Sequence, residues 1–506
     1  MLRHKILAAA LAIPLAAAPW FADSASAAPK APISTPVNVQ LMHHTTFGLN
    51  LNGFYELSNL DTGSKMLLTP SLISTVSYES GKVSIAGSGL TLSSVKGFTI
   101  SELEGSGVQL VTFSSATEMK SGAADTYEVK YSFVKGEAAE YVDTLTTPAG
   151  ETWYNVKNAS GAVGWVKNTT AYAPKAAPSL SLFGVNSKRY RGNIDLTQSS
   201  SKVKLINRLD MEDYLKGVVP AEMPASWHAE ALKVQAVASR SYAFKTNVLQ
   251  PNTSSQMYLG YDKEDARSNA VIAATAGQYV KYNGSPIQAF FYSTSGGKTA
   301  NVSDVWSSNQ ASYPYLVSVD SPGETSPYNN WTFTYSSSEL LSNFGLSPSA
   351  ALYSVSLVAP GANGEVRGAK LNTSLGLKEY SGSDYDMRKY FKNGTTLARS
   401  NWFTIDADKT YNMKTGSGTQ SQFGIKGASV QTADGVVSVS TPTVSIQTAS
   451  GTITKEADPK TISINGKGYG HRIGMSQYGA DAFAKQGWSY SKILTHYYKG
   501  TVVGPK

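Results

Sequence analysis

The sequence predicts an α+β protein with several domains, in which β-rich lobes surround one central helix in a cleft and separate β or α/β modules precede them. Apolar and polar residues alternate from Val37 to about Leu103, and turn residues such as Ser80-Gly81 interrupt the runs, which is typical of antiparallel strands. Residues 227–249 have the pattern of a long helix. The chain has 506 residues and 41% hydrophobic content, enough for roughly two to four globular domains.

Residues 1–27 are expected to be a secretory signal peptide. A basic start at residues 3–5 precedes an apolar run at 6–18, and Ala25-Ser26-Ala27 forms a small-x-small cleavage site. The alternative interpretation is an uncleaved membrane anchor. No later run approaches the ~18 apolar residues that a membrane helix needs, so we expect no stable membrane span after signal cleavage.

The composition excludes several classes of function. The chain has no cysteine, which excludes disulfides, thiolate metal ligands and a thiol nucleophile. Its net charge of +8 is mild and spread along the chain, which argues against nucleic acid and favours an anionic surface as partner. The six histidines show no metal-binding spacing, and HExxH, GxSxG and P-loop motifs are absent.

Two N-terminal modules are expected before the main domain. Residues 28–125 read as a β-rich module. Residues 126–175 read as a small possible wall-binding module, with TYEVKYSFV as a strand, GEAAEYVDTLTT as a short helix and two further strands. Residues 168–178 have the composition of a linker.

Residues 176–506 are expected to form one larger domain. Strands resume at Ser179, residues 211–219 suggest a helix, and the long helix follows with Ser226 as its N-cap. Further helices are predicted at 264–277, 337–344, 383–391, 476–486 and 489–497, and a hairpin at 356–372. Residues 409–460 are rich in Ser, Thr and Gly, which indicates a surface insertion or extended hairpin.

Glu222 is the main candidate for catalysis. Pro220 and Pro224 flank it, so it is not expected deep in a helix. Apolar neighbours such as Val219 and Met223 should favour its neutral form and raise its pKa, as a general acid requires. The alternative is a carboxylate that only caps the following helix.

Other polar residues are candidates for binding. Lys233 and Arg240 lie seven apart on one helix face and could hold an anionic or hydroxyl-rich ligand, or could form a solvated face. His471, Gln477 and Tyr478 lie in the Gly-rich segment KGYGHRIGMSQYG, where glycines allow backbone to approach a ligand. The alternative there is a tight turn with a packed histidine.

Four segments along residues 179–503 carry a family resemblance. They are RYRGNIDL with VKLINRLDMEDYL, then YLKGVVPAEMPASWHAEALKVQAVASRSYA, then FFYSTSGGKTANVSDVW with YPYLVSVDSP, and finally GYGHRIGMSQYGADAFAKQGWSYSKILTHYYKGT. In this order they resemble the SpoIID/LytB family of bacterial wall proteins, which includes lytic transglycosylases. Residues 37–175 are covered weakly or not at all.

The resemblance implies roles for particular residues. Glu222 is the implied catalytic acid/base, with Lys233 and Arg240 as functional basic residues on the next helix. The implied substrate is peptidoglycan glycan, preferably stripped of stem peptides. Some members hold zinc with His and Cys around the third segment. Because Tyr292 and Ser295 occupy that region here and there is no Cys, we assign these two to substrate binding and predict no metal and no cofactor.

The predicted function is a peptidoglycan lytic transglycosylase that forms 1,6-anhydro-N-acetylmuramic acid ends. A non-catalytic glycan-binding enhancer of a cell-wall amidase is the alternative, and a purely structural or adhesive surface protein is a third class. The expected partners are glycan strands and, for the alternative, a cell-wall amidase. The expected location is secreted and cell wall-associated, and a sporulation, germination or vegetative role stays open.

Overall fold

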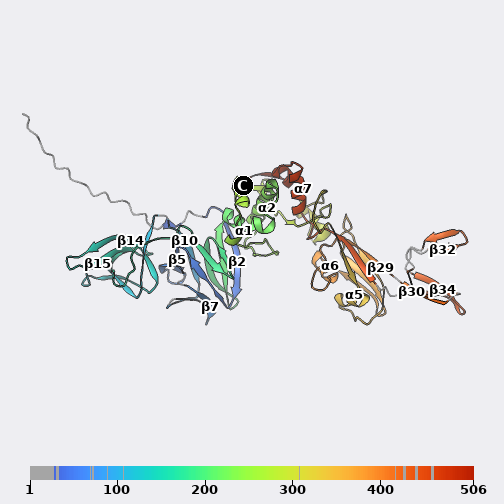
Figure 1. The fold of residues 1–506 in the computed structure, drawn as a ribbon, viewed down its shortest axis with the longest axis horizontal. Helices are drawn as coiled ribbons and strands as arrows, with labels where there is room; N and C mark the ends of the chain where they lie inside the picture. The colour runs from blue at the N-terminus through green and yellow to red at the C-terminus, as the bar shows by residue number, and fades with distance from the viewer. Residues whose placement is uncertain are drawn as a thin grey trace, which may run out of the picture. The chain divides into compact units, whose positions relative to one another are not determined.

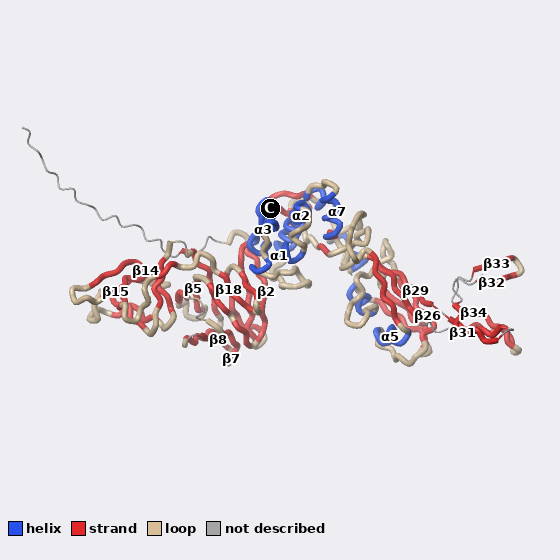
Figure 2. The backbone as a smooth tube through the Cα atoms, viewed as in Figure 1, coloured by secondary structure: helices blue, strands red, loops and turns tan. Residues whose placement is uncertain are grey.

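A computed structural model describes residues 28–29, 33–68, 70, 73–87, 89–105, 107–306, 308–408, 410–415, 418–424, 429–438, 443–456 and 461–506. The predicted signal peptide lies outside the described residues. Within these ranges the chain forms eight α-helices among more numerous strands, which agrees with an α+β class (Figure 1 and Figure 2). The chain divides into two compact units: unit 1 contains Leu41–Arg208, and unit 2 contains Ser34–Gln40 and Leu209–Lys506. None of the helices in the described part is both long and apolar enough to cross a membrane.

Unit 1 is built on antiparallel strands. Its main strands are β5 (Tyr55–Asn59), β6 (Lys65–Leu68), β10 (Phe98–Glu104), β11 (Gln109–Thr112), β12 (Thr117–Lys120), β13 (Val129–Phe133), β14 (Glu137–Thr146), β15 (Thr152–Lys157), β16 (Val163–Lys167), β20 (Asn193–Ser199) and β21 (Lys202–Asp210). Ten of them follow the order β13-β12-β16-β15-β14-β6-β5-β10-β20-β21, and β11 pairs with β14 outside this path. Because Ile194 and Leu196 of β20 are buried in pairing with β10, this strand belongs to unit 1. The units therefore divide near residue 208, at a different place from the boundary near 176 that the sequence suggests.

The hairpin turns of unit 1 lie where their residue types predict them. β7 (Thr75–Glu79), β8 (Lys82–Gly87) and β9 (Leu90–Ser94) form consecutive antiparallel pairs. Ser80 and Gly81, between the first two strands, have φ values of 49° and 80°. Two consecutive residues in this left-handed region are what a tight two-residue hairpin turn requires.

Two local predictions for the small module are wrong. GEAAEYVDTLTT is not a helix but the ten-residue strand β14, which pairs with β15, β6 and β11. Ala138 and Ala139 are fully buried there, so strand pairing and burial override the helix propensity of Glu and Ala. The expected linker at 168–178 is packed, because Lys175–Ala176 pairs with β11 and Ala177 is buried.

Unit 2 contains a lobe of helices around one buried helix. Its elements are α1 (Met211–Glu222), α2 (Ala229–Lys245), α3 (Ala266–Ala274), β22 (Gln278–Tyr282), α7 (Gln477–Lys485), α8 (Tyr490–Tyr497) and β38 (Val502–Pro505). α2 packs against the other four helices and β22. One face of α2 is buried and carries small side chains that allow close approach, namely Leu232, Ala236, Ser239 and Ala243. The helix is shorter than predicted and is capped by His228 rather than Ser226, with Nδ1 accepting from the N–H of Glu230 at 3.2 Å.

Unit 2 also contains a β-rich lobe, defined here as residues 330–408 and 461–467. Its elements are β25 (Asn330–Tyr335), α5 (Ser337–Asn343), β26 (Leu352–Val358), β27 (Gly368–Thr373), β28 (Gly376–Ser381), α6 (Asp384–Tyr390), β29 (Phe403–Asp408) and β36 (Thr461–Lys467). The strands form two sheets, in the orders β25-β36-β29 and β26-β27-β28. A core that includes Trp331, Leu371 and Phe391 joins both sheets to the two helices. Within the predicted insertion, the described residues form three hairpins: β30 (Thr410–Thr415) with β31 (Gly418–Gly424), β32 (Ser429–Thr432) with β33 (Gly435–Ser438), and β34 (Thr443–Thr448) with β35 (Gly451–Glu456).

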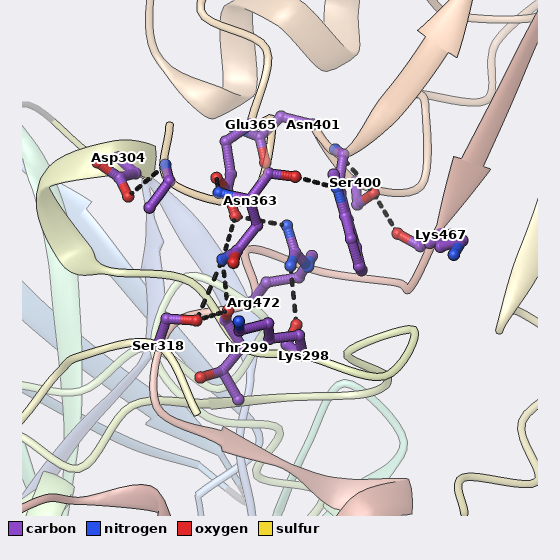
Figure 3. A network of polar contacts seen from close by, with 12 residues as sticks. Lys298, Thr299, Asp304, Ser318, Asn363, Glu365, Ser400, Asn401, Lys467 and Arg472 are labelled. Carbon is purple, nitrogen blue, oxygen red and sulfur yellow. Dashed lines mark hydrogen bonds and ion pairs between the residues drawn. The ribbon is translucent and has the colours of Figure 1, made fainter. Parts of the chain in front are cut away.

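A buried network ties the Gly-rich C-terminal segment to the β-rich lobe (Figure 3). Arg472 has a left-handed φ of 61°, and its Nη1 lies 3.0 Å from Oε1 of Glu365, with both side chains fully buried. Its other nitrogens donate to the carbonyls of Ser295 and Lys298. Asn363 also donates to Glu365, at 3.0 Å. A buried pair with its remaining donors satisfied is costly to break, so this network fixes the backbone beside His471.

Candidate active site

A cavity of about 700 Å³ lies in unit 2 and combines one carboxyl group, one guanidinium, one imidazole and several aromatic rings. Its walls come from the end of α1, the segment after α2, the segment around β24 (Phe291–Tyr292), helix α6 and the Gly-rich segment. The lining residues are Glu222, Tyr242, Thr253, Ser254, Ser255, Phe290, Phe291, Tyr292, Ser293, Trp306, Tyr385, Arg388, Leu397, Tyr469, Gly470, His471 and Gln477. A cavity of this size and composition fits a small portion of a larger ligand.

Glu222 is the last residue of α1. Asp210 caps the start of this helix, and Pro220 lies within its last turn. The helix ends there because Met223 is extended, with its N–H bonded to the carbonyl of Val219. Pro220 is thus accommodated in the last turn of α1, and Glu222 still belongs to this helix. Its carboxyl group lies at the cavity wall.

The Glu222 carboxyl group is partly buried and interacts with Met257 and Gln477. The backbone N–H of Met257 donates to Oε1 at 2.6 Å. Burial raises the pKa of Glu222 above its usual 4.5, while the hydrogen bonds from Met257 and Gln477 oppose this effect. Among the described residues, no Lys, Arg or His forms an ion pair with it. The arrangement therefore favours a carboxyl group that can carry a proton.

Lys233 and Arg240 do not line this cavity. Lys233 pairs with Glu230 one helical turn away, at 2.6 Å. Arg240 is fully buried, and its Nη2 and Nε contact both carboxylate oxygens of Glu212 at 2.6 and 2.8 Å. Its position therefore does not support direct contact with a glycan, and its evident role is to join α2 to α1.

His471 lies in the cavity beside Tyr292 and Trp306, at ring-centroid distances of 5.3 and 5.1 Å. Its Nδ1 accepts from the N–H of Ile473 at 3.1 Å, which leaves the proton of the neutral ring on Nε2. Burial, and then the positive charge of Arg388, lower the pKa of His471 to about 4. The imidazole is thus a neutral hydrogen-bonding group near neutral pH.

Gln477 and Tyr478 have different positions. The amide of Gln477 donates to the backbone carbonyl of Glu222 at 3.1 Å and to Oε1 of Gln235 at 3.2 Å. The ring of Tyr478 packs edge-on against Trp227 at 4.7 Å and does not line the cavity. The first therefore positions the end of α1, and the second supports the segment before α2.

Tyr292 and Ser295 also have different positions relative to the cavity. Tyr292 is buried, lines the cavity, and its hydroxyl lacks a hydrogen-bond partner among the described residues. Ser295 does not line the cavity, and its N–H and hydroxyl both donate to the buried Glu324. Within the described ranges, no three His, Cys, Asp or Glu side chains gather as a metal site would need.

The structure adds lining residues that the sequence did not single out, notably Tyr242, Phe290, Trp306, Tyr385 and Arg388. Phe290 and Trp306 pack edge to face at 4.8 Å, and Trp306 packs against His471. Their sequence separation from Glu222 gives no local signal of proximity. A pattern of capping residues predicts α6, but only tertiary structure brings Arg388 to the same cavity as Glu222.

Comparisons with known proteins agree with the resemblance seen in the sequence. Residues 199–282, which contain α1 and α2, match the family described as SpoIID, Stage II sporulation protein. The amidase enhancer of Bacillus subtilis (strain 168) is 36% identical over 302 residues, covering 57% of this chain and 40% of that protein. Stage II sporulation protein D of the same strain is 27% identical over 324 residues, covering 59% of this chain and 75% of that protein. The resemblance of residues 179–503 to the SpoIID/LytB family is thereby confirmed, and this chain spans less than half of the length of the amidase enhancer.

Proposed function

We propose that this chain, which contains a SpoIID-family domain, is a lytic transglycosylase that cleaves the glycan strands of bacterial peptidoglycan. The observation that carries the proposal is the position of Glu222 in an aromatic-lined cavity, without an ion-pair partner among the described residues and with a raised pKa. The same proposal places the protein outside the cytoplasmic membrane, where this substrate lies.

Glu222 acts first as an acid. Since Met257 donates to Oε1, the acid proton is carried by Oε2 and is given to the oxygen between N-acetylmuramic acid and N-acetylglucosamine. The bond from the anomeric carbon to that oxygen breaks, and N-acetylglucosamine leaves with a hydroxyl group. Glu222 is then a carboxylate beside the positive anomeric carbon.

Glu222 next acts as a base. It takes the proton from the 6-hydroxyl of the same muramic acid, whose oxygen bonds to the anomeric carbon and closes a 1,6-anhydro ring. The acid is restored and no water is consumed. Most glycoside hydrolases need a second carboxylate, whereas Glu222 is the one carboxyl group among the lining residues of the described chain, which supports a single-carboxylate reaction.

The other lining residues suit a sugar ligand. Tyr242, Phe290 and Trp306 offer aromatic surface against which the apolar faces of sugar rings can pack. Neutral His471, whose ring has backbone hydrogen bonds with Phe291 and Ile473, adds an uncharged aromatic surface beside Trp306. These contacts hold the glycosidic oxygen near Glu222 without adding charge at the acid.

A second candidate is a glycan-binding enhancer of a cell-wall amidase. The observation that favours it is the relative named amidase enhancer, which is 36% identical over 302 residues. In this case the cavity binds glycan but cuts nothing, and partner amidase activity rises when the two proteins are mixed.

Product analysis separates the two candidates. Purified peptide-free glycan is incubated with wild type, with Glu222→Gln and with the control Glu379→Gln. Glu379 is an exposed glutamate that pairs with Lys370 and does not line the cavity. Mass spectrometry should find anhydro ends with wild type and Glu379→Gln and essentially none with Glu222→Gln. Intact glycan in all three reactions, with an amidase stimulated by the wild type, would favour the enhancer.

A further inference from the structure

Two segments of unit 2 run together at the edge of the cavity, and we call them the rim: residues 399–402, which precede β29, and residues 467–470, at the end of β36. A backbone hydrogen bond of 2.9 Å joins them at either end, from the N–H of Lys467 to the carbonyl of Trp402 and from the N–H of Gly470 to the carbonyl of Arg399. Of the rim residues, Tyr469 and Gly470 line the cavity and the others do not. The rim therefore continues the surface of the protein beyond the cavity lining.

Two glycines hold the backbone of the rim close to the segment around β24. Gly468 and Gly470 have φ values of 79° and 110°, which residues with a side chain rarely adopt. A Cβ on Gly468 would lie 2.7 Å from the carbonyl oxygen of Thr294, and one on Gly470 would lie 2.8 Å from Cβ of Tyr292. The side chains that alternate with these glycines are exposed. The rim is thus a fixed backbone that presents its side chains to solvent.

Arg399 is held on this rim by aromatic rings and not by a carboxylate. Its guanidinium lies 4.2 Å from the ring centroid of Tyr328 and 5.6 Å from that of Tyr469. Such cation–π contacts fix the position of the guanidinium without using its N–H donors. Among the described residues, none accepts a hydrogen bond from this side chain and no carboxylate forms an ion pair with it. Its donors are therefore in place beside Tyr469, which is 37% exposed and belongs to the cavity lining.

Lys467 and Trp402 repeat this arrangement at the other end of the rim. The Nζ of Lys467 lies 5.4 Å from the ring centroid of Trp402, and Lys467 is exposed without a carboxylate partner in the described part of the chain. The indole is fixed, because its Nε1 donates to the carbonyl of Asn363 at 2.6 Å. Each end of the rim thus combines an aromatic ring with a cation whose donors are open. Aromatic rings suit the apolar faces of sugars, and open N–H donors suit hydroxyl and acetamido oxygens.

We propose that the rim is a second glycan subsite, which binds the sugar units adjoining those in the cavity and makes the protein bind long strands more tightly than short ones. A cavity of about 700 Å³ holds a ligand of about the size of a disaccharide. A longer strand must continue outside it, and the rim is an adjoining surface with rings and unoccupied donors. The inference rests on the glycan substrate of the proposed function but not on turnover.

A binding measurement in the Glu222→Gln background tests this inference separately from catalysis. Calorimetry compares two probes built from alternating N-acetylglucosamine and N-acetylmuramic acid, a disaccharide and an octasaccharide. The Glu222→Gln protein should bind the octasaccharide about tenfold or more tighter, beyond the roughly fourfold gain that repeated units give by statistics alone. Adding Arg399→Gln should reduce the gain toward the statistical value and leave disaccharide binding unchanged, because Arg399 does not line the cavity. Arg267→Gln, an exposed arginine paired with Asp265, is the matched control and should keep the full gain.

Several outcomes would overturn the inference. They are a gain no larger than the statistical value in the Glu222→Gln protein, a full gain after Arg399→Gln, and no binding of either probe. Thermal unfolding checks that each variant keeps its fold, and Lys467→Gln, a change at an exposed position, should also lower the gain. If wild type makes no anhydro ends but the gain is present and depends on Arg399, the lytic proposal fails and the rim subsite stands. If anhydro ends form without any gain, the rim subsite fails and the lytic proposal stands.

Discussion

The side-chain amide of Gln477 donates to the backbone carbonyl of Glu222 at 3.1 Å, across 255 positions of the sequence. This carbonyl is among the last of α1, where helix carbonyls have no partner within the helix. The same amide also reaches Gln235 on α2. The proposed acid is therefore positioned by the Gly-rich C-terminal segment as well as by its own helix.

Replacing Gln477 with alanine should slow turnover more than it weakens binding. Loss of the amide frees the end of α1, and a small displacement of a catalytic group costs about ten- to a hundredfold in kcat. Two buried acceptors also lose their donor, which should lower the free energy of unfolding by about 1–3 kcal/mol. Steady-state kinetics and thermal unfolding measure both effects. Gln486→Ala, at an exposed position, is the control, and a Gln477→Ala enzyme with wild-type kcat would contradict the positioning role.

The rate should fall as pH rises through the raised pKa of Glu222, because only the protonated form can act as the acid. Stability should follow the same group. Since the pKa in the folded state is above the unfolded value near 4.5, the unfolded chain loses this proton first, and the free energy of unfolding decreases as pH rises through that window. Glu222→Gln should remove this decrease, so its stability relative to wild type should rise with pH. A difference in melting temperature that is constant from pH 4 to 8 would disprove the assignment.

Arg240→Gln and Glu212→Gln should have similar effects, because each leaves the other partner of the pair unmatched. Removing one member of a buried ion pair costs about 3–5 kcal/mol, less here to the extent that Glu212 remains partly exposed. A double-mutant cycle by chemical denaturation measures the coupling. If Arg240 instead bound substrate, Arg240→Gln would raise KM while Glu212→Gln would not, and neither change would alter the unfolding midpoint much.

His471 should contribute a pH dependence of stability below neutrality. Its folded-state pKa of about 4 lies below the usual 6.5, so the unfolded chain takes up a proton first as pH falls, and stability is lost between about pH 6.5 and 4. The loss is of the order of 3 kcal/mol. His471→Asn should flatten this slope, whereas the exposed His44→Asn should leave it intact. If His471→Asn left the slope unchanged, another group would have to account for the difference in proton binding between the folded and unfolded states.

Local sequence signals predicted much of the fold. Ser383 and Ser489 mark helix starts because their hydroxyls accept from backbone N–H groups of the first turn, an interaction set within four residues. β14 escaped prediction because its residues favour a helix locally and are overruled by strands that pair with it from both sides. The sequence of one segment does not show which distant strands will pair with it.

The candidate site was predictable only in part, because local motifs identify some of its residues and tertiary contacts bring in the others. Glu222, Tyr292, His471 and Gln477 were singled out from the sequence and all line one cavity. Arg240 was placed on the correct helix, but helical spacing alone does not show that Glu212 occupies its guanidinium. Arg388 and Trp306 lie far from Glu222 in the sequence and meet it through tertiary packing, so no motif around the glutamate identifies them.

The central claim is that the sugar's own 6-hydroxyl, and not water, attacks the anomeric carbon when the glycosidic bond breaks. Digestion of peptide-free glycan in water enriched in heavy oxygen tests it, with mass spectrometry of the fragments. The account predicts fragments without the heavy isotope and with anhydro ends that disappear in Glu222→Gln. Heavy oxygen at the anomeric carbon of the new ends would mean hydrolysis and would contradict it.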